Sequence, residues 1–294
     1  MISFVGFSYR SSGIIRGKQL SHVIPRSDFI DVDSLSIPKN KVVIFVRKYE
    51  ERFAKACKNN GLIVGYDVAD NAVTDFLYGR TDNEDMSRYT SEFCDFYIVN
   101  NDVCKQQLSK ATDKKIYVIP HHSCNFSKKR NLLRSPTTLG YVGLPDYSLN
   151  EELLKLVCEK TGMKFLTSNP ENHKDLESSF SDIDIGIVFF DKNSIKQGIY
   201  DRTLKYKPNT KLTNFQSFGI PTICLPYESY KQFGGNNCIF VENIDQLIEK
   251  INSLRLDFEL YNSMSENSYR HAEDYHISKV KDLYLQIERE FCGK

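Results

Sequence analysis

The segment that decides the fold lies in the second half of the chain and reads KYKPNTKLTNFQSFGIPTICLP, residues 205–226. Pro208 stops any preceding helix, and Asn209 is a residue type that begins a helix by capping its first turn. Lys211 then falls in that first turn, where backbone N–H groups point outward and attract anions. Gly219 ends the helix, and the apolar run after it indicates a buried strand. The segment therefore predicts an anion-binding helix followed by a core strand.

Positive charge gathers at the start of this predicted helix. Lys205, Lys207 and Lys211 place three cations within seven residues. Together with the helix dipole, they would stabilise a bound phosphate. The alternative is a solvated loop that leads into a core helix, with lysines that only face water. The order of proline, cap, lysine and glycine favours the phosphate site.

Short β-branched and aromatic runs alternate with amphipathic stretches along the whole chain, which is the pattern of parallel sheets covered by crossover helices. The predicted strands are 2–7, 29–32, 42–46, 62–67, 96–99 and 116–119 in the first half, and 138–142, 164–167, 183–190, 221–225 and 238–241 in the second. The predicted helices are 50–59, 103–110, 150–161, 209–218, 245–254 and 278–291. We therefore expect two α/β domains, residues 1–133 and 134–275, followed by a C-terminal helix in 276–294. The basic stretch 128–137 would connect the domains.

Composition excludes several classes of protein. The 294 residues contain 39 basic and 38 acidic side chains, so the net charge of +1 offers no global attraction to nucleic acid or anionic membranes. No apolar run is long enough for a membrane span and no leader pattern is evident, so we expect a cytoplasmic protein. The eight cysteines lack zinc or disulfide spacing, and we expect mostly buried thiols and no metal.

The pattern K-P-x-x-K-L-x-N-x-x-x-x-G-I-P-T-I resembles the donor-binding motif of GT-B glycosyltransferases. The resemblance implies two Rossmann-like domains that face each other across a cleft, with a nucleoside diphosphate sugar held by the second domain and the C-terminal helix packed back on the first. Lys211 would contact the diphosphate, and Asn214, one turn later, would approach the ribose or sugar. Many retaining members have glutamate where this chain has Asn214, so the stereochemistry stays open. The predicted donor-binding residues are Gly143, Arg202, Lys207, Asn209, Lys211, Thr213 and Asn214.

The first half resembles the acceptor-side domain of the same family in three places: YDVADN at 66–71, SEFCDFYIVNN at 91–101 and YVIPHH at 117–122. In that family these strand ends and turns line the cleft. Ligands of parallel sheets collect beyond the carboxyl ends of the strands, where Asp67, Asp70, Asn100, His121 and His122 fall. We predict Asp70 and His121 as the catalytic groups for the acceptor hydroxyl, with Asp67 and His122 as the next candidates. Each aspartate is equally consistent with a helix cap, and one histidine with a structural hydrogen bond.

The first strand leads into FSYRSSGIIRGKQL, residues 7–20, which lacks the spacing of a dinucleotide fingerprint. We expect a flexible loop near the acceptor. Ser12 and Gly13 would let the backbone approach a substrate, and Arg10 or Arg16 would hold an anionic group. An ordinary turn with exposed arginines is the alternative.

Asp182 and Asp184 form a D-x-D triplet, a metal motif in a different glycosyltransferase fold. Here the triplet opens the hydrophobic run DIGIVFF, so we interpret Asp184 as a strand-start or cleft residue and expect no metal.

The resemblance implies transfer of a sugar from a nucleoside diphosphate sugar, UDP being the first candidate nucleotide, to a hydroxyl acceptor. The co-substrate is then the donor and no further cofactor is needed. A glycan or lipid-linked saccharide is the default acceptor. The alternatives are glycosylation of a hydroxymethylated DNA base of the phage type, a nucleotide-sugar epimerase and a non-catalytic nucleotide-sugar binder. Acceptor identity and oligomeric state stay open.

Overall fold

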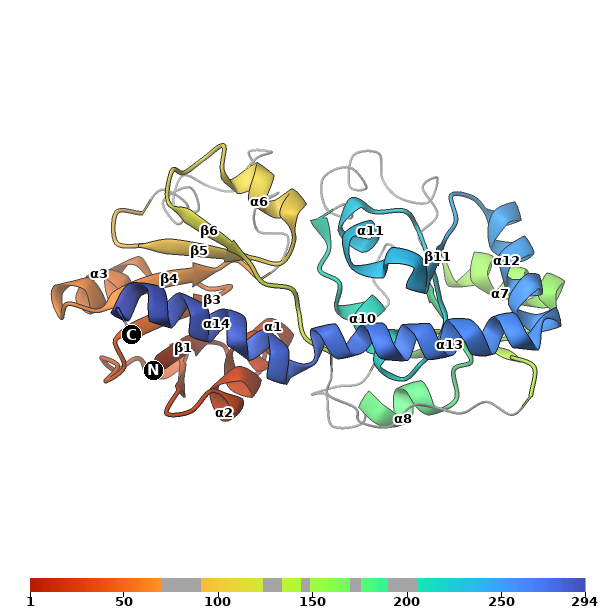
Figure 1. The fold of residues 1–294 in the computed structure, drawn as a ribbon, viewed down its shortest axis with the longest axis horizontal. Coiled ribbons are helices and arrows are strands. Elements are labelled where there is room, and N and C mark those ends of the chain that lie inside the picture. The colour runs from red at the N-terminus through yellow and green to blue at the C-terminus, as the bar shows by residue number, and fades with distance from the viewer. Residues whose placement is uncertain (70–90, 124–133, 144–148, 170–175, 190–205, 294) are drawn as a thin grey trace. The chain divides into compact units, whose positions relative to one another are not determined.

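The computed structural model describes residues 1–69, 91–123, 134–143, 149–169, 176–189 and 206–293. The chain divides into two compact units, which are described separately (Figure 1). Unit 1 comprises Met1–His121, Tyr206–Pro208 and Ile277–Lys294, and unit 2 comprises His122–Lys205 and Asn209–His276.

Unit 1 is built on a six-stranded parallel sheet with the order β2-β1-β3-β4-β5-β6. Its strands are β1 Ile2–Gly6, β2 Asp28–Asp31, β3 Val42–Val46, β4 Ile63–Asp67, β5 Phe96–Val99 and β6 Lys115–Val118. Its helices are α1 Ser11–Gly13, η1 Ile14–Gln19, α2 Leu20–Val23, η2 Val32–Ser34, α3 Glu51–Asn59, α6 Asp102–Leu108 and α14 Ile277–Cys292.

Alternate residues of these strands enter two separate apolar clusters, one on each face of the sheet. One cluster joins Val43, Phe45 and Tyr97 to residues of α3 and α6. The other joins Ile44 and Phe96 to residues of α2 and α14. Both faces are therefore covered, which explains why the central strands read as continuous hydrophobic runs.

The stretch expected to be a flexible N-terminal loop is helical from Ser11 to Val23, with a π-helical middle. Its glycines allow close packing here and do not provide flexibility. A Cβ on Gly13 would stand 2.0 Å from the Phe7 carbonyl oxygen, and one on Gly17 would stand 2.6 Å from the Phe29 ring. The loop prediction was wrong because glycine occurs both in flexible loops and where backbone packs closely against a neighbour, and the sequence alone does not distinguish the two.

Unit 2 contains a five-stranded parallel sheet with the order β11-β10-β9-β7-β8. Its strands are β7 Thr138–Val142, β8 Lys164–Ser168, β9 Ile185–Val188, β10 Thr222–Cys224 and β11 Cys238–Phe240. Its helices are α7 Glu151–Thr161, α8 Leu176–Ser181, α10 Thr210–Ser217, α11 Glu228–Gly234, η5 Gly235–Asn237, α12 Ile244–Leu256, α13 Phe258–Ala272 and η6 Glu273–Tyr275. The predicted strands of both halves are confirmed, within about two residues at their ends.

The transition from α10 to β10 follows the sequence pattern. Gly219 adopts a left-handed φ of 68°, and Ile220 N donates to the Phe215 carbonyl at 3.0 Å, which closes the helix. β10 is fully buried between β9 and β11. The predicted helix end and core strand are both confirmed.

Helix α13 was not predicted, because its buried stripe is polar. Tyr261, Ser265 and Ser268 are buried, and their hydroxyls donate to the carbonyls of Asp184 (2.9 Å), Gly219 (2.5 Å) and Asn237 (3.0 Å). Hydrogen bonds from hydroxyls to backbone carbonyls allow this helix face to be buried although it is polar. The sequence therefore lacks the apolar residues at helical spacing by which a buried helix is predicted.

Among the described residues, no helix has both the length and the apolar character needed to cross a membrane. Seven cysteines lie in this part of the chain, all as free thiols and six of them buried.

Candidate functional site

The candidate donor site lies at the carboxyl edge of the unit 2 sheet, where Lys211 meets Gly143. Gly143 directly follows β7, has a φ of +140° and donates its N–H to the Ser168 carbonyl at 2.8 Å. A Cβ on residue 143 would stand 2.9 Å from Cε and 3.2 Å from Nζ of Lys211. The Lys211 ammonium also lies 5.3 Å from the centroid of the Tyr141 ring. The first turn of α10 and the end of β7 are thus held together around one cation.

This arrangement requires glycine at position 143 for two reasons: its φ is one that side-chain-bearing residues rarely adopt, and Lys211 occupies the space of a side chain. Ligands of parallel α/β sheets bind beyond the carboxyl ends of the strands. The site combines that edge with a lysine and a helix N-terminus, which together favour a bound phosphate.

The other residues predicted for the donor differ in their roles. Asn209 is the N-cap residue of α10, but its side chain accepts no capping hydrogen bond, which corrects that expectation. Its carbonyl instead accepts from Thr213 N at 2.9 Å and from Thr213 Oγ1 at 3.2 Å. Thr213 and Asn214 are both buried, with exposed fractions of 0% and 7%.

Lys207 belongs to unit 1, because the chain segment Tyr206–Pro208 packs there, while α10 belongs to unit 2. Its side chain is half-buried. Arg202, Asp70 and residues 128–133 of the basic connector lie outside the described residues.

Asp184 serves the start of the sheet in unit 2, as the strand-start interpretation predicts. Its Oδ2 accepts from Thr137 N at 2.7 Å, Thr138 N at 3.1 Å and Arg134 Nη1 at 3.0 Å. The carboxylate is fully buried at the amino end of β9, the edge opposite the donor site. Within the described part of the chain, no group of three or more His, Cys, Asp or Glu side chains is arranged to bind a metal ion.

In unit 1, Asp67 lies at the centre of a buried polar network. Its Oδ2 accepts from Arg16 Nε at 2.7 Å and from the Tyr284 hydroxyl at 2.8 Å. Arg16 Nη1 also donates to the Ile119 carbonyl at 2.9 Å. Asp67 is fully buried and Arg16 is 1% exposed. The network therefore joins β4, the N-terminal helical segment and α14.

Burial raises the pKa of Asp67, while the Arg16 guanidinium and the hydrogen bonds from Tyr284 and Ala69 oppose this shift. Neither charge faces solvent. The structure thus corrects the expectation that Asp67 and Arg16 meet an acceptor, because the two side chains hold each other inside unit 1.

Ala69 follows β4 with a φ of +58°, which is uncommon for a residue with a side chain. Its N–H donates to Asp67 Oδ1 at 3.1 Å. Its carbonyl accepts from His121 Nε2 at 3.0 Å and from Asn100 Nδ2 at 3.4 Å. These contacts fix the backbone at the end of β4.

Because a carbonyl oxygen only accepts, His121 Nε2 carries a proton. That nitrogen is therefore not the base that removes a proton from an acceptor. His121 is 4% exposed and makes the structural hydrogen bond expected of one member of the pair, while His122 is 2% exposed and belongs to unit 2.

The remaining predicted acceptor residues lie in the N-terminal helical segment or, for Arg10, directly before it. Ser12 is 5% exposed, and Gly13 is packed against the Phe7 carbonyl, so neither offers open backbone to a substrate. This corrects the expectation for both. Arg10 is exposed, with its guanidinium 5.7 Å from the centroid of the Tyr9 ring.

Sequence reasoning missed Arg47. It directly follows β3, is exposed and has a φ of +63°. Its N–H donates to the Asp67 carbonyl at 2.8 Å, and its carbonyl accepts from the Tyr66 hydroxyl at 2.9 Å. Its position after a buried strand was the only signal available, since nothing in the residue type predicts a left-handed backbone.

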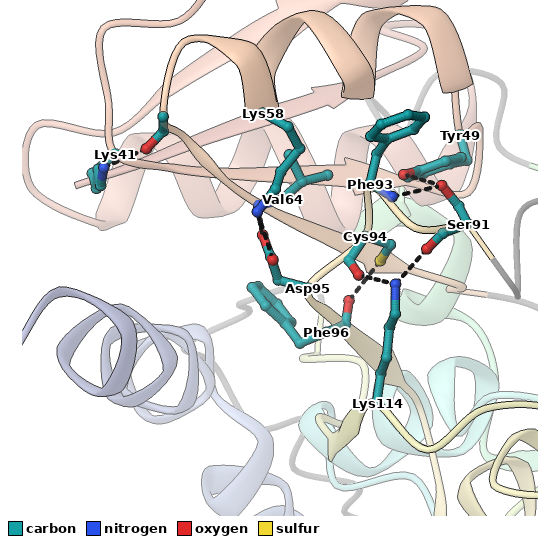
Figure 2. A network of polar contacts seen from close by, with 11 residues as sticks. Lys41, Tyr49, Lys58, Val64, Ser91, Phe93, Cys94, Asp95, Phe96 and Lys114 are labelled. Carbon is teal, nitrogen blue, oxygen red and sulfur yellow. Dashed lines mark hydrogen bonds and ion pairs between the residues drawn. The ribbon is translucent and has the colours of Figure 1, made fainter.

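The turn before β5 has a structural role (Figure 2). Asp95 accepts from Lys58 Nζ at 2.7 Å and from Val64 N at 2.8 Å, and Lys114 Nζ donates to the carbonyls of Ser91 and Cys94. This turn lies at the amino end of β5, the sheet edge away from the ligand side. The implication that it lines a ligand cleft is therefore wrong.

The chain has two units, each with a parallel sheet and covering helices, and it shares this GT-B fold with similar solved structures. The sequence matches no model of a known protein family, and none of the curated proteins matches it. The chain is, however, similar to several solved structures.

Pneumococcal O-GlcNAc transferase GtfA, in complex with UDP and GlcNAc, is similar at 16% identity and a TM-score of 0.62, over 87% of this chain and 58% of GtfA. A variant of S. aureus TarM determined with UDP is similar at 11% identity and a TM-score of 0.61, over 85% of this chain and 56% of TarM. Sucrose-phosphate synthase from Thermosynechococcus elongatus is similar at 10% identity and a TM-score of 0.67, over 99% of both chains. The chain thus spans little more than half of GtfA and TarM, and at these identities the likeness establishes the fold.

Proposed function

We propose that this protein is a glycosyltransferase that moves a sugar from a nucleoside diphosphate sugar, with UDP as the first candidate nucleotide, to a hydroxyl acceptor. The observation that carries the proposal is the placement of Lys211 against Gly143 at the carboxyl edge of a parallel sheet. The presence of UDP in the GtfA and TarM structures supports the choice of nucleotide.

The reaction breaks the bond between the anomeric carbon and the diphosphate oxygen, and joins that carbon to the acceptor oxygen, which loses its proton. Negative charge grows on the departing diphosphate. In the proposal, Lys211 and the N–H groups in the first turn of α10 neutralise that charge, which lowers the barrier. The proposal assigns this role to no metal ion, and it needs no cofactor besides the donor and the acceptor.

Asn214 stays a proposed contact of the ribose or sugar, since it lies one turn after Lys211 on α10. Asp70 stays the proposed base for the acceptor hydroxyl. His121 takes a positioning role in the proposal, because its Nε2 is committed to Ala69. A saccharide is the default acceptor, and no described contact favours a DNA base, an epimerase or a non-catalytic binder.

The test is a calorimetric titration of the protein with UDP, GDP and ADP, followed by a screen of nucleotide sugars for release of free sugar. Binding of one nucleoside diphosphate and slow hydrolysis of the matching donor are expected. A protein that binds no nucleoside diphosphate and hydrolyses no donor would contradict the proposal.

A further inference from the structure

Tyr206 anchors the chain in unit 1 immediately before the helix that carries the candidate donor site. Its side chain is 1% exposed and packs in the apolar cluster that contains Tyr97 and Leu108. The residues Tyr206–Pro208 belong to unit 1, and the chain enters unit 2 at Asn209. The anchor and the start of α10 are therefore consecutive in the chain.

A second set of contacts holds the backbone of this anchor. The Tyr206 carbonyl accepts from Asn101 Nδ2 at 3.3 Å and from Cys104 Sγ at 3.7 Å. The other end of the Asn101 side chain caps α6, because its Oδ1 accepts from Cys104 N at 2.8 Å. Asn101 is fully buried. One side chain thus ties the anchor to the start of a helix in unit 1.

The connection from the anchor to Lys211 is short and stiff. Only the residues KPNT separate Tyr206 from Lys211. Pro208 has a ring-locked φ, and Asn209 is fully buried as the N-cap residue of α10. Four residues therefore link the anchored Tyr206 to Lys211, in the first turn of α10, where the phosphate is proposed to bind.

We infer that Tyr206 and Asn101 are positioning residues for the donor site: the anchor in unit 1 holds the first turn of α10 in the arrangement that binds the diphosphate. This inference rests on the proposed function. Coupling of this kind is reciprocal, so a donor that binds better when the anchor is docked also stabilises the docked anchor. Both directions can be measured.

The first measurement uses the substitution Asn101→Asp. Aspartate caps a helix as well as asparagine does, so the bond to Cys104 N is kept. The Nδ2 group that donates to the Tyr206 carbonyl and to Asn100 Oδ1 is lost, and a carboxylate oxygen takes its place against both acceptors. Asn243→Asp is the matched control, because Asn243 caps α12 through Oδ1 to Gln246 N at 2.9 Å in unit 2. We expect the Kd for UDP to rise about fivefold or more in Asn101→Asp and to stay within about twofold in the control.

The second measurement needs no variant. Hydrogen exchange of the wild-type protein is recorded with and without saturating UDP. We expect slower exchange in α6, whose cap holds the anchor, and unchanged exchange in α3 of the same unit. A purely structural role for Asn101 predicts a lower melting temperature in Asn101→Asp, but unchanged UDP affinity of the folded variant and no effect of UDP on α6.

The outcomes separate the two proposals. Wild-type protein that binds UDP with no change in α6, or an Asn101→Asp variant that binds UDP as tightly as wild type, overturns the anchor and leaves the proposed function standing. Wild-type protein that binds no nucleoside diphosphate and hydrolyses no donor overturns both.

Discussion

Lys211 occupies the space that a side chain at Gly143 would need, with its Cε 2.9 Å from a Cβ built on that glycine. The lysine belongs to the first turn of α10 and the glycine to the end of β7, so the contact joins the two elements that form the candidate donor site. A glycine that serves only a turn would not have a cation packed over it.

The substitution Gly143→Ala is expected to lower both stability and UDP affinity. The φ of +140° costs an alanine about 1–3 kcal/mol, and the new methyl group displaces the Lys211 ammonium. Gly235→Ala is the matched control, because Gly235 has a φ of +51° but its nearest neighbour would be 3.9 Å from a Cβ. Melting temperature and UDP titration are measured on both. Equal UDP affinity in the two variants would show that Gly143 does not contribute to donor binding.

Replacing Lys211 by alanine is expected to weaken UDP binding by about 1.5–3 kcal/mol, the range for a charge-assisted contact to phosphate. This corresponds to a loss of affinity of about 10-fold to 150-fold. Lys231→Ala is the control, since Lys231 lies in the same unit, is exposed and pairs with Glu228 at 2.9 Å. Calorimetry that shows the same affinity for both folded variants would remove Lys211 from the site.

Alkaline pH is expected to destabilise unit 1. Burial raises the pKa of Cys94 to about 12 and that of Cys57 to about 11, from an ordinary value of 9.0. The unfolded chain therefore releases these thiol protons at lower pH than the folded one, so stability present below pH 9 is lost as pH rises toward 12.

Urea unfolding at pH 8, 9, 10 and 11 measures this loss. The substitution Cys94→Ala should reduce the dependence on pH, although it lowers stability at pH 8 by leaving a cavity. Cys292→Ala is the control, because that thiol is only partly buried. A Cys94→Ala variant whose stability falls with pH as steeply as that of the wild type would argue against burial as the cause.

The sequence predicts the sheets because burial controls the choice of residues in a central strand. β3, VVIFV, is buried along its whole length and cannot be mistaken for a loop. The end of α10 was predictable for a similar reason, since Gly219 needs a left-handed backbone. Local constraints of this kind can be recognised from a few neighbouring residues in the sequence.

The role of Asp67 was not predictable, because its partners are distant in the chain. Arg16 and Tyr284 are 51 and 217 residues away, and only the folded unit 1 brings them to one carboxylate. The same sequence position, a strand end on the ligand side of the sheet, is compatible with a binding residue or with a buried ion pair. In the structure, Asp67 belongs to a buried ion pair with Arg16.

The buried pair of Arg16 and Asp67 provides the sharpest stability test. Changing Asp67 to asparagine leaves the Arg16 charge without its counter-ion in the interior, and breaking a buried pair in this way costs about 3–5 kcal/mol. Arg16→Met should cost a similar amount, because it leaves the carboxylate behind. The double variant should recover part of the loss, since neither charge then remains buried.

Lys115→Ala, which removes an exposed pair with Glu290 in the same unit, is the control and should change stability far less. Urea unfolding of the four variants gives the comparison, and single variants as stable as Lys115→Ala would show that the Arg16–Asp67 pair does not hold unit 1 together.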